Sequence, residues 1–257
     1  MLITQKVSNE VLPFIKSNIN PGSNIILGCS GGADSTALAI IMSNVVSKYY
    51  INIQLHYVNH KLRDEKSILK EKEFVSRLAK KLNFSYSYSD ISKNEFDNLH
   101  DSSLENTARI LRYQKLSINA QKFNSNIILL GHTANDSAET ILFNIIRGSG
   151  LKGIEGIRKI TSKKINDNQF KILRPLIDIK KDITEKICTE NFINPIFDKS
   201  NDDYKYTRNK IRKEIIPGLE DINPKVINAL IKLGDIAKIK NSSEEGFVNY
   251  FYNNLVS

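Results

Sequence analysis

The chain has few sulfur-containing residues and no tryptophan: its 257 residues include two cysteines and two methionines. Cys29 and Cys188 lie far apart in the sequence, and no Cys-x-x-Cys pair occurs. Disulfide frameworks and cysteine-based zinc sites are therefore not expected. The composition fits a reducing compartment.

Long apolar runs are also missing, since no stretch reaches the ~18 consecutive apolar residues that indicate a membrane-spanning helix. The first residues mix polar and apolar side chains and include Lys6 and Glu10, rather than a basic segment followed by an apolar core. They do not resemble a secretory signal. We therefore expect no membrane partner and a cytoplasmic protein, or a protein of the plastid stroma if the gene is organellar.

The chain does have an excess of positive charge, with a net value of +9. Residues 147–240 hold 21 Lys and Arg against 13 Asp and Glu, so most of the excess lies in the C-terminal half. A basic half beside a near-neutral one suggests a polyanionic partner. A Lys-rich, AT-biased proteome is the alternative explanation.

Hydrophobic periodicity predicts an α/β fold. Four short apolar runs indicate buried strands, each followed by a segment of helical period. The strands are expected at residues 25–29, 51–58, 84–88 and 127–131, and the helices at 34–48, 66–82, 102–123 and 136–146. This alternation predicts right-handed crossovers and a Rossmann-like parallel five-stranded sheet with helices on both faces. Residues 157–173 indicate a hairpin.

The strongest motif is Ser30-Gly31-Gly32-Ala33-Asp34-Ser35, which joins the first strand to the first helix. Adjacent glycines let the backbone turn its N–H groups toward one anion. The start of a helix adds unpaired N–H groups and a partial positive charge. Two serine hydroxyls complete what we expect to be a cradle for a pyrophosphate group.

Three other motifs compete with this interpretation. Residues 28–32 fit the G-x-S-x-G hydrolase elbow, but no histidine follows in the late chain to serve as its base. A Walker A loop needs Gly-Lys-Ser/Thr after the glycines, which is missing. Residues 148–153 match G-x-G-x-x-G, but they follow an expected helix rather than a strand, so a structural turn is favoured.

The S-G-G-x-D-S pattern after a first strand resembles the PP-loop ATP pyrophosphatases. The resemblance implies that the loop holds the β and γ phosphates of ATP, that ATP is cut between the α and β phosphates, and that an oxygen of the substrate is adenylated. It implies ATP and Mg²⁺ as cofactors. The implied ATP-binding residues are Ser30, Gly31, Gly32, Ala33, Asp34, Ser35 and Val58.

Later motifs are similar to those of the tRNA(Ile)-lysidine synthases, in the same order along roughly residues 20 to 225. They lie at residues 57–63, 105–113, 131–140, 147–153, 174–176, 198–201 and 206–212. Three positions depart from the family pattern: Tyr57 replaces a histidine, Asn135 an aspartate and Ser137 a glutamine. The change at Asn135 removes one negative charge, whereas Asp136 keeps its carboxylate.

This resemblance implies a ligase that attaches L-lysine to C2 of cytidine 34 in the CAU anticodon of tRNA(Ile) through an adenylated intermediate. The implied catalytic residues are Asp34, Arg112, His132, Asp136 and Arg208. Asp34 or Asp136 would hold a metal ion or lysine, and Arg208 would contact phosphate or RNA. Arg112 and His132 would stabilise charge near the base, with His132 or Asp136 as proton acceptor. A buried structural role is the alternative for His132.

The resemblance divides the chain into a PP-loop catalytic domain at residues 1–176 and a basic, tRNA-contacting helical extension at residues 177–257. Lys152, Arg158, Lys159, Lys163 and Lys164 form a basic run that could follow the RNA backbone or simply be a solvated hairpin tip. A tRNA cytidine 2-thiolase is the alternative enzyme, although it would be expected to use paired cysteines. A non-catalytic tRNA-binding protein is the third candidate, and whether the chain forms a homodimer is open.

Overall fold

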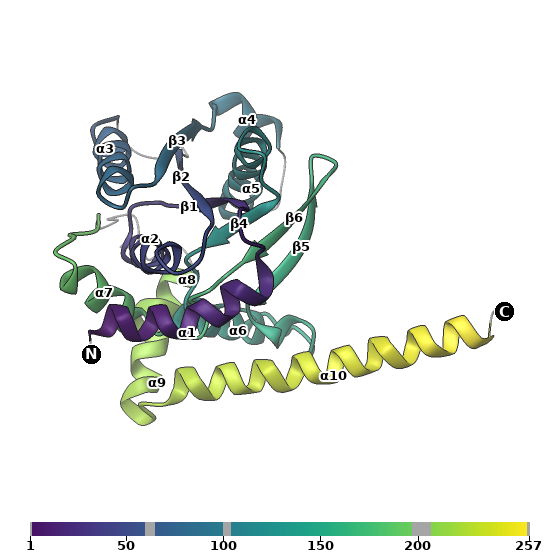
Figure 1. Cartoon of the computed structure of the whole chain (residues 1–257). Coiled ribbons are helices and arrows are strands. Elements are labelled where there is room, and N and C mark those ends of the chain that lie inside the picture. The colour runs from purple at the N-terminus through teal and green to yellow at the C-terminus, as the bar shows by residue number, and fades with distance from the viewer. Residues whose placement is uncertain (1, 60–64, 100–103, 197–206, 256–257) are drawn as a thin grey trace. The chain divides into compact units, whose positions relative to one another are not determined.

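The computed structural model describes residues 2–59, 65–99, 104–196 and 207–255. The chain forms two compact units, both of which are discontinuous in sequence. The first unit comprises residues 1–132 and 159–197, and the second comprises residues 133–158 and 198–257. All strands of the described chain belong to the first unit (Figure 1).

The first unit is built on one six-stranded sheet in the order β3-β2-β1-β4-β6-β5. Its strands are β1 (Asn24–Gly28), β2 (Asn52–Asn59), β3 (Ser85–Asp90), β4 (Ile127–Leu130), β5 (Ile160–Ile165) and β6 (Asn168–Leu173). β5 pairs antiparallel with β6, and every other pairing is parallel. The α/β class and the parallel core are confirmed.

The expected number of five strands is wrong by one, because the hairpin contributes both of its strands to the sheet. Asn166 and Asp167 both adopt positive φ, at 48° and 64°. Two consecutive left-handed residues form the tight turn that matches the twist of paired strands. β6 therefore runs back along β5 and pairs with β4, where Leu173 lies opposite Leu129.

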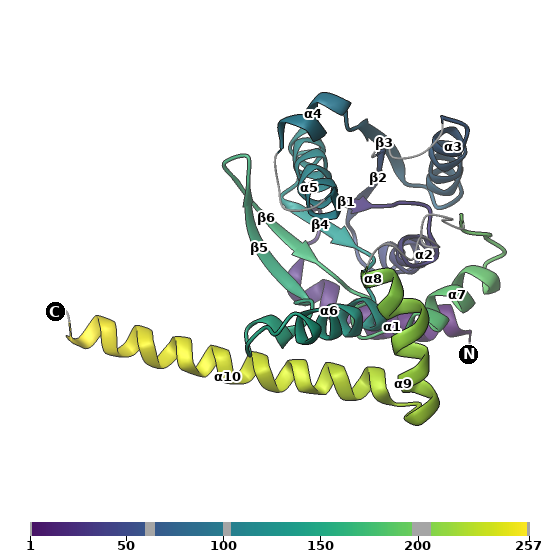
Figure 2. The same cartoon turned by 180° about the vertical axis from the view of Figure 1, so that it is seen from behind.

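Helices cover both faces of the sheet (Figures 1 and 2). One face packs α1 (Ile3–Asn18), α2 (Ala33–Val46), α3 (Glu65–Lys81) and α7 (Lys181–Glu190), while α5 (Leu104–Lys122) covers the other and α4 (Lys93–Asn98) precedes it. Alternate strand residues serve the two cores: Ile25 and Leu27 face α2, and Ile26 faces α5. This is the period-2 alternation of a strand buried on both sides.

Helix α7 belongs to the first unit although it lies beyond residue 176. It packs on α1 and α2, and the carboxylate of Glu190 accepts the backbone N–H groups of Ile3 (2.9 Å) and Thr4 (2.8 Å). These contacts satisfy donors at the start of α1 that have no partner within their own helix. The functional boundary after residue 176 stays a prediction.

The second unit is helical. It contains α6 (Ala134–Ile146), a 3₁₀ turn η1 (Gly153–Glu155), α8 (Thr207–Lys210), a π-helical turn η3 (Ile211–Ile215), α9 (Ile216–Ile222) and α10 (Val226–Leu255). α6 and α10 lie side by side in Figures 1 and 2. A Cβ added at Gly234 of α10 would lie 3.1 Å from the carbonyl oxygens of Ile154 and Glu155, so glycine allows this close packing.

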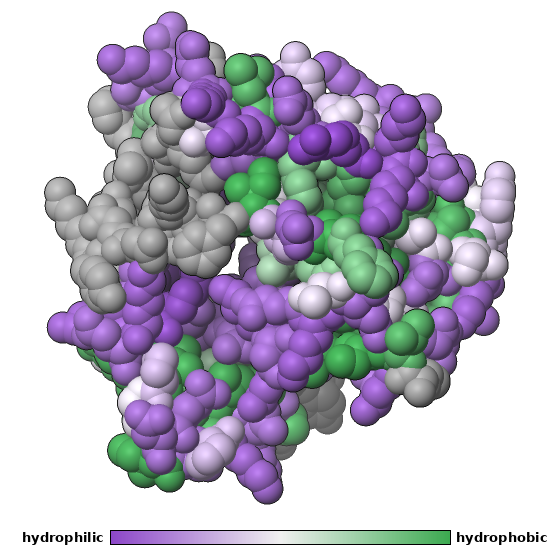
Figure 3. All heavy atoms as spheres, turned by 90° about the vertical axis from the view of Figure 1, so that its left-hand side faces the viewer, coloured by the Kyte–Doolittle hydropathy of each residue, from purple (hydrophilic) through white to green (hydrophobic). Residues whose placement is uncertain are grey.

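Hydrophilic residues cover much of the molecular face in Figure 3, where apolar residues form smaller, separate areas. Among the described residues, no helix combines the length and apolar character that a membrane crossing requires.

Candidate functional site

The loop at residues 30–35, which the sequence predicts as a pyrophosphate cradle and which we call the phosphate loop, turns tightly between β1 and α2. Gly31 adopts φ +85°, and a Cβ there would lie 3.2 Å from a ring carbon of Phe74 and 3.4 Å from Cδ1 of Ile196. Any other L-residue would be strained at this φ and crowded as well. Gly32 is the N-cap of α2, and no side chain caps that helix. The first N–H groups of α2 are therefore oriented for an anion.

Serine hydroxyls hold the loop in shape. The buried hydroxyl of Ser35 donates to the carbonyl oxygen of Gly32 (3.1 Å) and accepts the backbone N–H of Ser30 (3.2 Å). The two serine oxygens lie 3.2 Å apart. The N–H of Ile196 also donates to the carbonyl oxygen of Gly31, at 2.9 Å. These contacts fix the loop before any ligand arrives, which reduces the entropy lost on binding.

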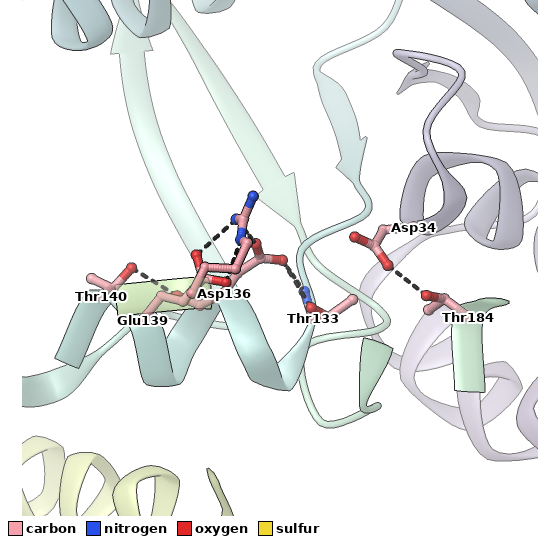
Figure 4. A network of polar contacts seen from close by, with 7 residues as sticks. Asp34, Thr133, Asp136, Glu139, Thr140 and Thr184 are labelled. Atoms are coloured by element: carbon pink, nitrogen blue, oxygen red, sulfur yellow. Dashed lines mark hydrogen bonds and ion pairs between the residues drawn. The ribbon is translucent and has the colours of Figure 1, made fainter. Parts of the chain in front are cut away.

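Asp34 lies in the first turn of α2, and its carboxylate accepts a hydrogen bond from the hydroxyl of Thr184 on α7 (Figure 4). Thr184 is fully buried, so this contact fixes one carboxylate oxygen in a defined direction. Sequence reasoning missed Thr184, because 150 residues separate the two partners and no motif includes the threonine.

Both cysteines lie beside this loop and are buried. The sulfur of Cys188 is 3.5 Å from the carbonyl oxygen of Ala33, and that of Cys29 is 3.7 Å from the Ser35 hydroxyl. Burial raises the pKa of Cys188 to about 12, with a smaller contribution from the negative charge of Asp34. Burial likewise raises the pKa of Cys29. Neither thiol is poised to form the thiolate that sulfur transfer requires.

His132 and Arg174 come together at the carboxyl ends of the neighbouring strands β4 and β6. Arg174 is 6% exposed, and its Nε donates to Nδ1 of His132 at 3.1 Å. Its other nitrogens donate to the Thr161 hydroxyl (2.9 Å) and the Tyr113 hydroxyl (3.3 Å). Ligands of open α/β sheets bind beyond this edge of the sheet. The motif residue His132 therefore has a defined partner that sequence reasoning had not assigned to it.

Two further predicted site residues of the first unit, Arg112 and Val58, lie on α5 and β2. The guanidinium of Arg112 on α5 lies 5.9 Å from the ring centre of Tyr113. Val58 is part-buried near the end of β2, opposite Ser89. Tyr57, which departs from the family pattern, is buried and donates to the carboxylate of Glu71 at 2.6 Å.

In the second unit, Asp136 closes the start of α6. Its Oδ2 accepts both the N–H (2.7 Å) and the hydroxyl (2.9 Å) of Thr133, which is the N-cap residue. Its other oxygen lies 3.7 Å from Arg212, whose guanidinium makes two 2.7 Å contacts with Glu139. Asp136 is thus held by a cap and an ion pair, as a carboxylate that must keep its position would be.

Arg208 lies on α8 with its guanidinium carbon 5.2 Å from the ring centre of Phe143. Arg147 lies at the same distance from that ring. Phe143 therefore orients two arginines of the predicted motifs through cation–π contact. Ser137, another departure from the family pattern, is buried and accepts the N–H of Ile157 at 3.2 Å.

Carboxylates neutralise much of the predicted basic run. Arg158 pairs with Glu155, Lys159 with Asp178, and Lys164 with Asp167. Lys163 instead lies 4.4 Å from the ring centre of Tyr113. These contacts favour a solvated hairpin for the run, and RNA contact by it stays a prediction. The motif at residues 198–201, His60 and Tyr206 lie outside the described residues.

Metal binding would rest on few protein ligands. Within the described part of the chain, no cluster of three or more His, Cys, Asp or Glu residues could hold a metal ion. A site with a single protein carboxylate still fits Mg²⁺. This ion commonly binds through one or two carboxylates, while substrate phosphates and water complete its shell. Asp34 and Asp136 each present carboxylate oxygens in their own unit.

A family model described as a PP-loop domain matches residues 3–219. The chain is similar to the tRNA(Ile)-lysidine synthase of Clostridioides difficile, with 34% identity over 91% of this chain and 50% of that protein. It is 36% identical to the tRNA(Ile)-lysidine synthase of Thermosipho africanus over 83% of this chain and 48% of that one. The chain spans about half the length of these curated relatives.

Solved structures resemble the fold at low sequence identity. A U34-tRNA thiolase from Methanococcus maripaludis with its [4Fe-4S] cluster aligns with a TM-score of 0.73, at 14% identity, over 92% of this chain and 79% of that one. An NAD+ synthetase from Burkholderia pseudomallei aligns with a TM-score of 0.54, at 13% identity, over 93% and 89%. At these identities the likeness concerns the fold alone.

Proposed function

Because this chain belongs to the PP-loop domain family, we propose that it ligates L-lysine to C2 of cytidine 34 in the CAU anticodon of tRNA(Ile), with ATP as the energy source. The product, lysidine, changes codon reading from AUG to AUA. One observation carries the ATP part of the proposal: the double-glycine loop at the uncapped start of α2. The relatives named as lysidine synthases support the substrate.

The chemistry explains why a phosphate loop is needed. The C2 carbonyl of cytosine is a poor electrophile, because ring nitrogens donate electrons into it. In the first step its oxygen attacks the α-phosphorus of ATP, the bond to the β-phosphate oxygen breaks, and pyrophosphate leaves with the electron pair. In the second step the ε-nitrogen of lysine bonds to C2, the C2–O bond breaks, and AMP leaves while the nitrogen loses a proton.

The phosphate loop would hold the β and γ phosphates through the N–H groups at the start of α2 and the hydroxyls of Ser30 and Ser35. Bound Mg²⁺ would neutralise negative charge on the departing pyrophosphate. Asp34 or Asp136 would hold that ion or the ammonium group of the incoming lysine. Arg112 and His132 would stabilise charge near the adenylated base, and Arg208 would contact phosphate or RNA.

Lysine must attack as a neutral amine. Its ordinary pKa of about 10.4 means that deprotonation costs roughly 4 to 5 kcal/mol at pH 7. A carboxylate such as that of Asp136 would serve as the base that takes up the proton lost by the nitrogen as it bonds to C2. The anticodon loop is single-stranded, so its cytosine can turn out of the stack and enter a pocket.

Two further expectations belong to the same proposal: residues 177–257 contact tRNA, and the protein acts in the cytoplasm or the plastid stroma. The proposal is compatible with a monomer and with a homodimer. The burial of Cys29 and Cys188 argues against the alternative tRNA 2-thiolase.

The test is lysine incorporation. The protein is incubated with ATP, labelled lysine and tRNA(Ile) bearing a CAU anticodon, and AMP, pyrophosphate and labelled tRNA are measured. Asp34→Ala is expected to lower incorporation by about 100-fold, since it removes a carboxylate that would hold Mg²⁺ or the lysine ammonium. Asp182→Ala is the matched control, because that carboxylate lies on α7 and is 55% exposed in a surface pair with Lys186.

The control is expected to keep wild-type activity. Conversion of ATP to ADP and orthophosphate without AMP would contradict the proposal. Tight tRNA binding with no incorporation would instead support the non-catalytic tRNA-binding protein, and incorporation of sulfur would support the thiolase.

A further inference from the structure

The hydrogen bond between Arg174 and His132 determines which ring nitrogen of the histidine carries the proton. A guanidinium has only donors and stays charged at any physiological pH. The Nδ1 atom of His132, 3.1 Å from Nε of Arg174, must therefore be an acceptor. A neutral imidazole with an accepting Nδ1 carries its hydrogen on Nε2. Protonation of Nδ1 would replace this hydrogen bond with two facing donors and two like charges.

Arg174 is anchored well enough to impose this choice. It extends from the end of β6, is buried, and reaches Thr161 on β5 and Tyr113 on α5 with its terminal nitrogens. Its own N–H donates to the carbonyl oxygen of Lys159 at 2.9 Å. The planar guanidinium cannot rotate without losing several of these hydrogen bonds. A lysine ammonium at this position could make only some of the same bonds.

We infer that Arg174 is a positioning residue that fixes His132 in the Nε2–H form, so that His132 acts as a hydrogen-bond donor and not as the proton acceptor. This inference rests on the proposed function. The partner of the Nε2–H group would be an oxygen that gains negative charge when cytosine oxygen attacks the α-phosphorus. The proton released by lysine in the second step then goes to a group other than His132.

Nitrogen NMR of the histidine rings tests the tautomer directly. The chain has four histidines, so a His132→Gln variant assigns the His132 signals by their loss. The wild-type ring is expected to show an unprotonated Nδ1 and a protonated Nε2 between about pH 6 and 8. A signal from Nδ1–H, or an imidazolium throughout that range, would overturn the inference.

Substitutions at His132 separate a donor from a base. Glutamine places an amide N–H near the position of Nε2 but cannot accept a proton, and alanine offers neither. We expect His132→Ala to slow AMP formation by about 100-fold and His132→Gln to stay within about tenfold of wild type. Equal loss in both variants would contradict the donor role.

Substitution of Arg174 tests its part. Arg174→Met is expected to slow AMP formation by about 10- to 100-fold, as loss of a partner that orients a functional histidine does. It should also add an acid limb near pH 6.5 to the rate profile, because the freed ring can now titrate. Lys171→Met is the control, since it removes a part-buried cation from the same strand. A wild-type pH profile and tautomer in folded Arg174→Met would refute the positioning role.

Failure of the inference about Arg174 can be distinguished from failure of the proposed function. If Arg174→Met does not fold, the wild-type NMR spectrum and the pair of His132 variants still decide the matter. If the wild-type protein releases no AMP with any tRNA, the proposed function is wrong, whereas the ring nitrogens still report whether Arg174 fixes the tautomer.

Discussion

His56 on β2 is the residue whose burial has the clearest consequence for stability. It is 1% exposed, and its Nδ1 lies 2.8 Å from the hydroxyl of Ser87. Burial, with a smaller contribution from the charge of Lys122, lowers its pKa from 6.5 to about 4. The folded protein therefore holds the ring neutral at a pH where the unfolded chain already binds a proton.

The sign of the effect follows from that difference. As pH falls below 6.5, His56 binds a proton in the unfolded state but stays neutral in the folded state until about pH 4. The free energy of unfolding therefore decreases through this window. We expect His56 to contribute a loss of about 2 kcal/mol in the free energy of unfolding between pH 7 and 5. Urea titrations of wild type and His56→Gln measure it. Parallel pH dependence in the two proteins would contradict the expectation.

Individual site residues were predictable where a local motif specifies them. The positive φ of Gly31 and the place of Asp34 in the first turn of α2 follow from the S-G-G-x-D-S pattern. The partners of those residues were not predictable. Thr184 reaches Asp34, and Arg174 reaches His132, only because the sheet and α7 bring distant segments together.

At the scale of secondary-structure elements, η3 contacts α6 through the ion pair between Arg212 and Glu139, whose two side chains differ in burial. The side chain of Glu139 is 8% exposed, whereas that of Arg212 is 32% exposed. Removal of the arginine leaves a buried carboxylate without its main cation. Such a change costs more than the loss of a surface pair, because the remaining charge stays desolvated.

Arg212→Met is therefore expected to lower the free energy of unfolding by about 2 kcal/mol, a value discounted for the partial exposure of the arginine. Lys186→Met breaks the exposed pair with Asp182 and should change the free energy of unfolding by less than about 0.5 kcal/mol. The double variant Arg212→Met, Glu139→Met should recover most of the loss, because it also removes the buried carboxylate of Glu139. Equal effects of the two single variants would show that burial does not govern the pair.

Elements themselves were predictable from period and turn chemistry, within limits. Short apolar runs indicated β1 and β4, alternating apolar residues indicated β2, and Asn166-Asp167-Asn168 indicated the hairpin turn. The hairpin was predicted, but the number of strands in the sheet was not. The pairing of β6 with β4 that adds both hairpin strands to the sheet is a long-range contact, and periodicity carries no information about it. The place of α7 in the first unit was hidden for the same reason.

At the scale of the whole molecule, the net charge of +9 makes a prediction about RNA binding. Cationic side chains that neutralise phosphates release counterions, so the affinity for tRNA should fall steeply with salt. We expect at least a tenfold weaker Kd on raising salt from about 50 to 200 mM. Filter binding over a salt series gives the slope of log affinity against log salt.

Arg208→Ala should reduce that slope by about one unit if its guanidinium meets a phosphate. Lys48→Ala should leave the slope unchanged, because that exposed lysine follows α2, outside residues 177–257, and its ammonium donates to Oδ1 of Asn9. An affinity that does not respond to salt would remove the polyanionic partner from consideration, and the charge would then reflect composition alone.

The two compact units share a chain that passes between them three times, after residues 132, 158 and 197. During synthesis, β4 therefore leaves the ribosome before β5 and β6, the strands on one side of it in the sheet, have been made. Likewise, α6 is made before α10, the helix on which it packs. Neither unit can therefore complete its fold until residues beyond the other unit's first segment have been made. A single proteolytic nick between residues 133 and 197 would likewise leave two fragments that each hold parts of both units. Limited digestion there should yield fragments that stay together until denatured.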